Sequence, residues 1–270
     1  MYLEHYGLRE SPFNITPDPK FLFLAGPHRV AFDHLLYGIR ERKGFIELIG
    51  EVGCGKTTLC RAVLAELPDT VKTAFILNPA LSGNQLIRAI LKDFGLPTVG
   101  KDRLDLIERL NEFLLEQAAA GFNVAVFIDE AQNLLPEVME QIRLLSNLET
   151  DQHKLMQLVI AGQPELKKRL AGHELRQLRQ RITVRCELTA LTADETVIYL
   201  NHRLQVAGAG PDVFFDDAAA RLVYKHSGGI PRLINNLADR ALLAGYVAQK
   251  RKLTRAEVKI AAADLKGDMR

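Results

Sequence analysis

Residues 45–67 have the sequence FIELIGEVGCGKTTLCRAVLAEL, which joins three features in order. The apolar run Phe45–Ile49 precedes the glycine-rich loop Gly50–Thr57, which matches the pattern G-x-x-x-x-G-K-[ST], and the helix-competent run Thr58–Leu67 follows. A strand, a glycine-rich turn and a helix in this order predict a loop that wraps phosphate groups. The alternative is a purely structural glycine-rich turn, and the flanking strand and helix favour the phosphate-binding loop.

The residue types in this loop suit separate tasks in nucleotide binding. Glycines let backbone amides turn toward phosphate oxygens, and the start of the following helix adds a partial positive charge. The Lys56 ammonium can reach the β and γ phosphates, and the Thr57 hydroxyl can ligate Mg²⁺. We therefore expect ATP or ADP with Mg²⁺ as cofactors, bound by Gly50, Glu51, Val52, Gly53, Cys54, Gly55, Lys56, Thr57 and Thr58.

Apolar runs separated by helical patterns predict a parallel sheet with helices on both faces. The expected strands are Gly44–Ile49, Lys72–Leu77, Asn123–Ile128, Leu155–Ala161 and Ile182–Leu188. Two of the helical segments carry apolar stripes, formed by Leu104, Ile107, Leu110 and Leu114 and by Val138, Ile142, Leu145 and Leu148. Residues 44–189 are thus expected to form a three-layer α/β/α nucleotide-binding domain with the P-loop NTPase fold.

Residues 190–270 are predicted to form a small all-helical lid domain of four helices, because the strand signal stops and helix-end signals replace it. These signals are two capping boxes, an aspartate cap, a glycine pair that ends a helix and a proline that starts one. They are Thr192 with Glu195, Thr254 with Glu257, Asp216, Gly228-Gly229 and Pro231.

Residues 1–43 are expected to form an amino-terminal arm and a first helix that pack on the nucleotide site. The prolines predict an irregular arm, because each fixes its backbone and lacks an amide hydrogen; they are Pro12, Pro17, Pro19 and Pro27. Phe13, Phe21 and Phe23 are expected to anchor this arm on the α/β domain.

The composition excludes several classes of protein. The 270 residues are 47% apolar and 25% charged, which predicts one large or two modest soluble domains. Lys and Arg number 35 against 33 Asp and Glu, so the net charge of +2 provides no general attraction for nucleic acid or anionic membranes. The cysteines Cys54, Cys60 and Cys186 have neither disulfide nor zinc-site spacing and fit a reducing compartment. No apolar run is long enough to cross a bilayer, and Met1–Arg9 lacks the apolar stretch of a signal peptide.

The run Val124–Ile128 delivers Asp129 and Glu130 at the strand end where ligands of open α/β sheets bind. Asp129 is expected to hold Mg²⁺ through its coordinated waters, and Glu130 to polarise the water that attacks the γ-phosphorus. Two acids that only cap the next helix are the alternative. The phosphate-binding loop upstream favours the catalytic interpretation.

Gln163 follows the next expected strand, Leu155–Ala161. If this strand lies beside Val124–Ile128, Gln163 is close to the acid pair, where its amide can sense the γ-phosphate or hold the attacking water. The alternative is a turn residue that precedes the helix Glu165–Leu170.

Basic residues concentrate between Leu170 and Arg185, as Arg176, Arg179, Arg181 and Arg185, against the single acid Glu174. A solvated helix face is the simplest explanation. A guanidinium donated to the γ-phosphate of a neighbouring subunit would stabilise the charge that develops in transfer and tie hydrolysis to assembly. Arg181 is the first candidate for this catalytic role and Arg179 the second.

Arg232 follows the turn Ser227–Pro231 and lies at the start of a predicted helix. If the helical domain folds over the phosphate-binding loop, the Arg232 side chain meets the phosphates of its own subunit and the nucleotide sets the interdomain angle. A free surface arginine is the alternative.

Four motifs together resemble the AAA+ ATPase module in order and spacing: Gly50–Thr57, Val126–Glu130, Gln180–Ile182 and Gly228–Arg232. The resemblance covers almost the whole chain. More narrowly, YLEHYGL at 2–8, SPF at 11–13 and TPDP at 16–19 are similar to the start of the general secretion pathway protein A family. The strings DEAQNL at 129–134 and AGQPEL at 161–166 strengthen this likeness.

This resemblance implies an ATPase that forms a homo-oligomer, a ring or a dimer, and helps to place secretin or pilus machinery in the Gram-negative envelope. It implies that the arm around Ile15–Phe23 lies against the adenine. Family members often add a membrane segment and a peptidoglycan-binding region, which we do not expect within residues 1–270. The expected location is the cytoplasm or the periphery of the inner membrane.

Three functions are compatible with these features. The first is an oligomerising ATPase that converts hydrolysis into lid movement and so assembles or remodels an envelope partner. The second is a DNA-associated ATPase of the transposition target-selection type, for which Lys167–Arg185 is the candidate basic track. The third is a nucleotide-gated binding module with negligible hydrolysis.

Overall fold

A computed structural model describes residues 2–77, 81–98, 102–149 and 154–267 of the protein. The chain divides into two compact units. The α/β unit comprises Pro27–Glu51 and Leu59–Leu188, and the helical unit comprises Met1–Gly26, Val52–Thr58 and Thr189–Arg270. Residue 1 and residues 268–270 of the predicted lid lie outside the described residues.

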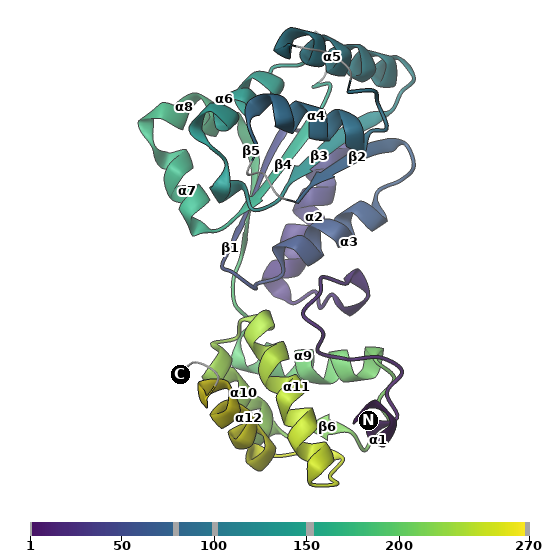
Figure 1. The fold of residues 1–270 in the computed structure, drawn as a ribbon, viewed down its shortest axis with the longest axis vertical. Helices are drawn as coiled ribbons and strands as arrows, with labels where there is room; N and C mark the ends of the chain where they lie inside the picture. Colours follow the sequence, from purple (N-terminus) through teal and green to yellow (C-terminus); the bar gives the residue numbers. More distant parts are fainter. Residues whose placement is uncertain (1, 78–80, 99–101, 150–153, 268–270) are drawn as a thin grey trace. The chain divides into compact units, whose positions relative to one another are not determined.

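A parallel five-stranded sheet forms the centre of the described part of the α/β unit (Figure 1). Its order is β2-β3-β4-β1-β5, with bounds Val71–Ile76, Asn123–Ile128, Gln157–Gly162, Phe45–Gly50 and Ile182–Leu188 respectively. All five predicted strands are confirmed, and their observed ends lie within two residues of the predicted ends. The three central strands are buried at every position, whereas the edge strands β2 and β5 are only partly buried. Burial at every position is therefore confined to the strands that have neighbours on both sides.

Helices cover both faces of this sheet. One face packs, through one apolar cluster, against α4 (Gly83–Asp93), α5 (Arg103–Ala119), α6 (Pro136–Leu145), α7 (Pro164–Ala171) and α8 (Arg176–Arg181). Helix α2 (Gly26–Arg40) packs on the other face, where a Cβ on Gly38 would lie 2.6 Å from Ile46 Cδ1. Helix α3 (Lys56–Glu66) follows the glycine-rich loop. The parallel sheet and its two helical layers agree with the predicted fold class.

The predicted apolar stripe of α6 is confirmed at Val138, Ile142 and Leu145, which are buried. The stripe predicted for α5 is wrong at Leu104, which is 62% exposed. Successive helical residues are about 100° apart, so Leu104 points away from the side on which Leu106 lies. The buried residues of α5 are Leu106, Leu110 and Leu114.

The described part of the helical unit contains four helices beyond residue 190: α9 (Ala193–Val206), α10 (Asp217–Ser227), α11 (Pro231–Val247) and α12 (Arg255–Gly267). The predicted ends are present. Thr192 and Glu195 form a capping box, Asp216 accepts a hydrogen bond from the Ala219 amide, and Gly228 ends α10 with φ of 60°. Glu257 accepts a hydrogen bond from the Thr254 amide, but the Thr254 hydroxyl accepts one from Ala256 instead of Glu257.

This unit is not entirely helical. The two-residue strands β6 (Phe214–Phe215) and β7 (Lys252–Leu253) pair in parallel and tie the start of α10 to the start of α12. Two residues are too few to produce a recognisable alternation of apolar and polar side chains, so the sequence pattern could not reveal this pairing.

The amino-terminal arm differs from its prediction. It contains α1 (Tyr2–Tyr6) and a 3₁₀ turn, η1 (Pro19–Phe21), and is therefore not wholly irregular. Phe13 and Phe21 are buried in the apolar cluster of the helical unit, and Phe23 packs against that cluster. The expectation that these rings anchor the arm on the α/β domain is wrong, because their aromatic partners are Phe215 and Tyr199 in the helical unit.

Arg203 of α9 supplies the polar part of this anchoring. Its side chain is only 7% exposed. The guanidinium donates hydrogen bonds to the carbonyl oxygens of Pro12 and Asn14 and lies 4.6 Å from the centre of the Phe21 ring. A buried cation with carbonyl and aromatic partners holds the arm to α9.

Among the described helices, none combines the length and the apolar character that a membrane span requires.

Candidate functional site

The sheet order brings to one edge the carboxyl ends of the three strands that precede predicted site residues. In a parallel sheet all carboxyl ends lie at the same edge, and here β4 lies between β3 and β1. The glycine-rich loop follows β1, Asp129 and Glu130 follow β3, and Gln163 follows β4. The neighbouring strands required for Gln163 to approach the acid pair are therefore present.

The glycine-rich loop has the backbone conformation that its glycines predict. Gly53 and Gly55 have φ of 82° and 96°, values that side-chain-bearing residues rarely adopt. Helix α3 begins at Lys56, whose side chain is 5% exposed. The remaining predicted loop residues range from buried to exposed: Gly50 and Cys54 are buried, Gly53, Gly55, Thr57 and Thr58 are intermediate, and Glu51 and Val52 are exposed.

Arg232 lies against this loop within the helical unit. Its backbone amide donates a hydrogen bond to the Gly53 carbonyl oxygen at 3.2 Å, while its side chain is exposed. A Cβ on Gly53 would lie 2.7 Å from the Arg232 Cβ and 3.2 Å from Ile230 Cγ2. Only glycine therefore permits this approach of α11 to the loop.

The acid pair occupies a strained turn after β3. Asp129 is 2% exposed, and its Oδ1 accepts a hydrogen bond from the Glu130 amide at 2.9 Å. Glu130 has φ of 53° and ψ of 35°, the left-handed region that costs a non-glycine residue about 1 kcal/mol or more. Strain of this kind is concentrated at functional positions.

Two glutamine side chains converge on Glu130. Gln132 Nε2 and Gln163 Nε2 donate hydrogen bonds to Glu130 Oε2 at 2.6 Å and 3.2 Å. Gln132 Oε1 in turn accepts a hydrogen bond from the Gln163 backbone amide at 3.1 Å. The contact between Gln163 and Glu130 agrees with the sequence-based placement of Gln163. No role was predicted for Gln132, although its position three residues after Asp129 on a polar turn was a usable signal.

The arginine candidates are distributed around α8 and β5. Arg181 is partly buried and its Nη1 lies 3.5 Å from the Ser146 carbonyl oxygen, whereas the Arg179 side chain is exposed. Arg185 Nε lies 3.5 Å from the Glu47 carboxylate in β1. Burial raises the pKa of Glu47, and the Arg185 charge opposes that rise. Glu130, Gln132 and Gln163 form what we call the Glu130 cluster. Among the described residues, none of these arginines contacts it.

The donor set fits a magnesium nucleotide. The loop offers backbone amides and a buried ammonium, which suit phosphate oxygens, and Thr57 and Asp129 offer the hydroxyl and carboxylate oxygens that Mg²⁺ prefers. In the described ranges, no three His, Cys, Asp or Glu side chains gather into a dedicated metal cage. Mg²⁺ typically uses one or two carboxylates together with substrate phosphates, so the observed donor set is the expected kind.

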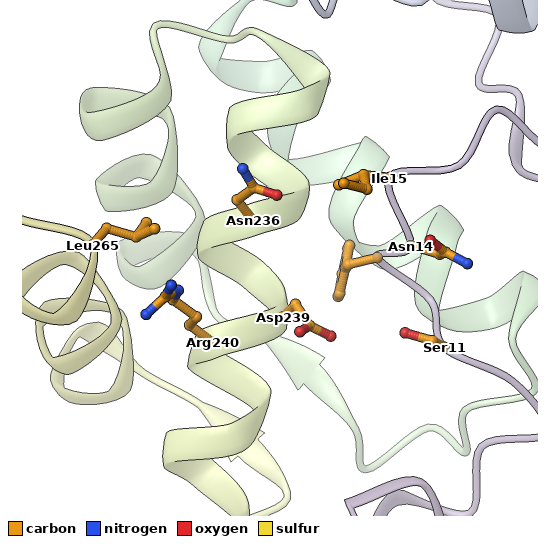
Figure 2. Close-up of a pocket in the computed structure, with 8 residues that line it drawn as sticks. Ser11, Asn14, Ile15, Asn236, Asp239, Arg240 and Leu265 are labelled. Atoms are coloured by element: carbon orange, nitrogen blue, oxygen red, sulfur yellow. The ribbon is translucent and has the colours of Figure 1, made fainter. Parts of the chain in front are cut away.

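A separate pocket of about 530 Å³ lies in the helical unit (Figure 2). Asn236, Asp239 and Arg240 of α11 line it together with residues of the arm and Leu265 of α12. Asp239 Oδ1 accepts a hydrogen bond from the Tyr2 hydroxyl at 2.7 Å. None of the predicted catalytic, phosphate-binding or magnesium-binding residues lines this pocket, but Ile15 does, which belongs to the arm segment expected to lie against the adenine. It shows how the arm packs along α11 and offers no arrangement for phosphate binding.

Comparison with known proteins agrees with this geometry. A family model described as an AAA domain matches residues 39–170. Over 268 residues the chain is 45% identical to General secretion pathway protein A of Aeromonas hydrophila, a match that covers 99% of this chain and 49% of that protein. The chain thus spans about half the length of this relative.

Solved structures with similar folds include the ORC2 protein of Aeropyrum pernix in ADPNP–ADP complexes, with a TM-score of 0.71, 17% identity and coverage of 94% of this chain and 71% of that chain. Cdc6p of Pyrobaculum aerophilum has a TM-score of 0.72 and 18% identity, with coverage of 92% and 70%. The RuvB Holliday junction branch migration motor of Thermotoga maritima has a TM-score of 0.61 and 21% identity, with coverage of 90% and 70%.

At these identities the solved structures establish the fold alone. An AAA domain implies nucleotide binding and supports ATPase activity in general terms. Residues 39–170 thus match the AAA domain model, and nearly the whole chain is similar in sequence to General secretion pathway protein A.

Proposed function

We propose that the chain binds and hydrolyses Mg-ATP and couples hydrolysis to oligomerisation and to movement of its helical lid, in order to assemble or remodel an envelope complex of the secretion or pilus type. The observation that supports hydrolysis most directly is the set of amide donors that converges on Glu130 Oε2. A carboxylate held in this way, in a strained turn at the ligand-binding edge of the sheet, suits a general base better than a helix cap.

In this proposal each group has one role. The Gly50–Thr58 loop, including Lys56, binds the phosphates, and Thr57 and Asp129 would hold Mg²⁺, which would supply positive charge to the phosphate oxygens. Glu130 accepts a proton from the attacking water while the water oxygen bonds to the γ-phosphorus. The bond to the β–γ bridging oxygen breaks, which releases ADP and phosphate. The Gln163 amide helps to orient the water.

The lid component of the proposal rests on Arg232. The Arg232 amide bonds to the Gly53 carbonyl oxygen, so a change in the loop on nucleotide binding is passed directly to the start of α11. We propose that the exposed Arg232 side chain binds the phosphates of its own subunit. The gain or loss of the γ-phosphate then changes the lid position.

The oligomeric component of the proposal rests on Arg179 and Arg181. The exposed Arg179 side chain can reach a neighbouring subunit without breaking a contact, whereas Arg181 must leave Ser146. We therefore propose Arg179 as the first candidate and Arg181 as the second, the opposite of the order proposed from the sequence. An arginine supplied by a neighbour accelerates phosphoryl transfer by about 10³-fold or more, so turnover would depend on assembly.

The concentration dependence of ATPase activity tests this component. We expect the rate per subunit to rise with protein concentration and to reach a plateau, and we expect Arg179→Ala to remove the rise. Arg176→Ala, an exposed arginine of the same helix, is the matched control. A rate per subunit that is independent of concentration, with Arg179→Ala and Arg181→Ala both at the wild-type rate, would eliminate the shared site.

The envelope role is proposed from the name of the relative, General secretion pathway protein A, together with the match over nearly the whole chain. The partner would be a secretion or pilus assembly protein, and the location would be the cytoplasm or the periphery of the inner membrane. Deletion of the gene should leave the envelope complex unassembled, and the Glu130→Gln variant should fail to restore it. Restoration by that variant would separate the envelope role from hydrolysis.

The DNA-associated alternative gains no support from the basic segment. Lys167 pairs with Glu187, Arg185 with Glu47, and the Arg169 guanidinium donates to the Gln132 carbonyl oxygen. Part of the positive charge of this segment is therefore already paired within the chain, which weakens its contribution to phosphate contacts. Retention on DNA at low salt that falls steeply with added salt, or stimulation of turnover by DNA, would restore this alternative.

A further inference from the structure

Gln132 occupies an unusual position in the site, because three of its four hydrogen-bonding groups have described partners. Its Nε2 donates to Glu130 Oε2 at 2.6 Å, and its Oε1 accepts from the Gln163 amide at 3.1 Å. Its backbone oxygen accepts a hydrogen bond from Arg169 Nη1 at 2.6 Å. Gln132 thus links the turn after β3 to the turn after β4 through its side chain, and to helix α7 through its backbone oxygen.

The packing around Gln132 leaves little freedom for another arrangement. A Cβ on Gly162 would lie 3.1 Å from Gln132 Oε1 and 2.6 Å from Leu166 Cδ2. The missing side chain at Gly162 therefore makes room for the amide. Gln132 is itself partly buried, whereas its neighbour Asn133 in the same 3₁₀ turn, η2 (Ala131–Asn133), is exposed.

Both amide donors bond to the same oxygen of Glu130. Oε2 accepts from Gln132 and Gln163, while no described residue donates a hydrogen bond to Oε1. Two donors on one oxygen fix the rotation of the carboxylate, and the other oxygen remains available to accept a proton from water. The left-handed backbone of Glu130 sets the direction in which its side chain leaves the turn.

We propose that Gln132 is a positioning residue for Glu130: its amide holds Oε2, so that Oε1 is presented to the attacking water. This inference rests on the proposed ATPase function and goes beyond it, because it assigns Gln132 a role that acts only through Glu130. Gln163 holds the same oxygen more weakly, at 3.2 Å, and its backbone amide secures Gln132. Gln132 therefore contributes more to the orientation of the carboxylate than the Gln163 side chain does.

The test compares Gln132→Met with wild type under Mg-ATP turnover. Methionine keeps the length of the side chain and removes the amide. We expect kcat to fall about 10- to 100-fold, as for the loss of a hydrogen bond to a charged group, while KM and the affinity for a non-hydrolysable ATP analogue change less than about twofold. Asn133→Met is the matched control and should retain wild-type kcat.

A double-mutant cycle distinguishes positioning from a general structural role. In a Glu130→Gln background the carboxylate is absent, so Gln132→Met should cause no further loss of kcat. If Gln132→Met instead lowers kcat by the same factor in both backgrounds, Gln132 acts independently of Glu130 and the proposal is overturned. A rise in KM with unchanged kcat would overturn it as well.

Thermal unfolding provides the check on folding. The Tm of Gln132→Met should stay close to that of Asn133→Met, and Gln132→Glu, which has the same size but places a like charge beside Glu130, provides a second variant with a larger expected loss of kcat. If wild type shows no turnover, the proposed ATPase function fails and the positioning role fails with it. If wild type turns over but Glu130→Gln is as fast, the base role of Glu130 fails, and the positioning role fails with it although the ATPase function stands. If both of those tests succeed and Gln132→Met retains wild-type kcat, the positioning role alone fails.

Discussion

Glu130 of the α/β unit and Glu257 of the helical unit lie in similar surroundings but are bonded differently. Both carboxylates are at least partly enclosed and both accept two or more hydrogen bonds. Glu257 accepts from Lys250 Nζ on Oε1 and from the Thr254 amide and hydroxyl on Oε2, so both of its oxygens are occupied. Glu130 accepts both of its bonds on Oε2. The number of carboxylate oxygens that accept hydrogen bonds therefore differs between the two residues. Glu257, with both oxygens bonded, suits a structural role, whereas Glu130, with one oxygen bonded, suits a chemical role.

The titration of Glu257 fits this structural role. Burial by itself would raise its pKa, but hydrogen bonds from Lys250 and Thr254 outweigh burial and lower the pKa to about 2. The ionised carboxylate therefore stabilises the helical unit at neutral pH. We expect Glu257 to contribute to the stability of the folded state and not to ATP turnover. For Glu130 we expect the reverse.

The largest effect among the proposed substitutions is expected at Lys56, the buried cation of the glycine-rich loop. Lys56 belongs with Glu130 on the chemical side of the comparison. We expect Lys56→Ala to weaken ATP binding about 10²-fold, because it removes charge-assisted hydrogen bonds to phosphate, and to lower turnover further. Isothermal titration calorimetry with Mg-ATP measures the binding. Lys168→Ala, an exposed lysine of α7, is the control and should bind as wild type does. Equal ATP affinities for the two variants would show that Lys56 does not bind the nucleotide and would contradict the assignment of the loop to the binding site.

The next effect concerns Glu257 and falls on stability. A pKa lowered from 4.5 to about 2 corresponds to roughly 3 kcal/mol of unfolding free energy at neutral pH. Because the folded-state pKa is depressed, this contribution is complete above the unfolded pKa of 4.5 and is lost as pH falls toward 2. Glu257→Gln should therefore lower stability at pH 7 and flatten the pH dependence between pH 4.5 and 2.

Urea unfolding at several pH values, together with ATPase assays, measures both parts of the Glu257 prediction. The variant should keep the wild-type kcat under conditions where it is folded. A large loss of kcat with unchanged stability would contradict the division between structural and chemical carboxylates.

The smallest of these effects is expected at Gly162, next to the Glu130 cluster. Gly162→Ala forces Leu166 and Gln132 to move, because the new Cβ would lie 2.6 Å and 3.1 Å from their nearest atoms. We expect a loss of kcat of about tenfold and a loss of stability of about 1–3 kcal/mol. Gly83→Ala is the control, because its new Cβ would lie 3.7 Å from the nearest atom. This variant should retain the kcat and the stability of wild type. Equal kcat values would show that the cluster tolerates displacement.

The features that sequence predicts best here are those that depend on backbone chemistry and on a repeated pattern. The five strands, the glycines of the phosphate-binding loop, the Thr192 and Asp216 caps and the helix end at Gly228 all follow from local rules. The approach of Gln163 to Glu130 was also predictable, because it required only that β3 and β4 be neighbours.

The features that escaped prediction depend on contacts between distant residues. The arm packs on the helical unit because Arg203 and Phe215, about 190 residues or more away, supply its partners. The importance of Gln132 emerges only when Gly162 and Arg169 close around it. The exposure of Leu104 depends on which side of α5 packs against the sheet, and that side is the one that carries Leu106, Leu110 and Leu114.

The most direct test of the account is the rate of phosphate release from Mg-ATP by wild type and by Glu130→Gln, with ATP affinity measured for both. Because Glu130 serves as the base and makes no essential contribution to binding, the account predicts a rate at least about 10²-fold lower for the variant and an affinity within about twofold of wild type. Equal rates for the two proteins, or a loss of rate explained entirely by a loss of ATP binding, would contradict it.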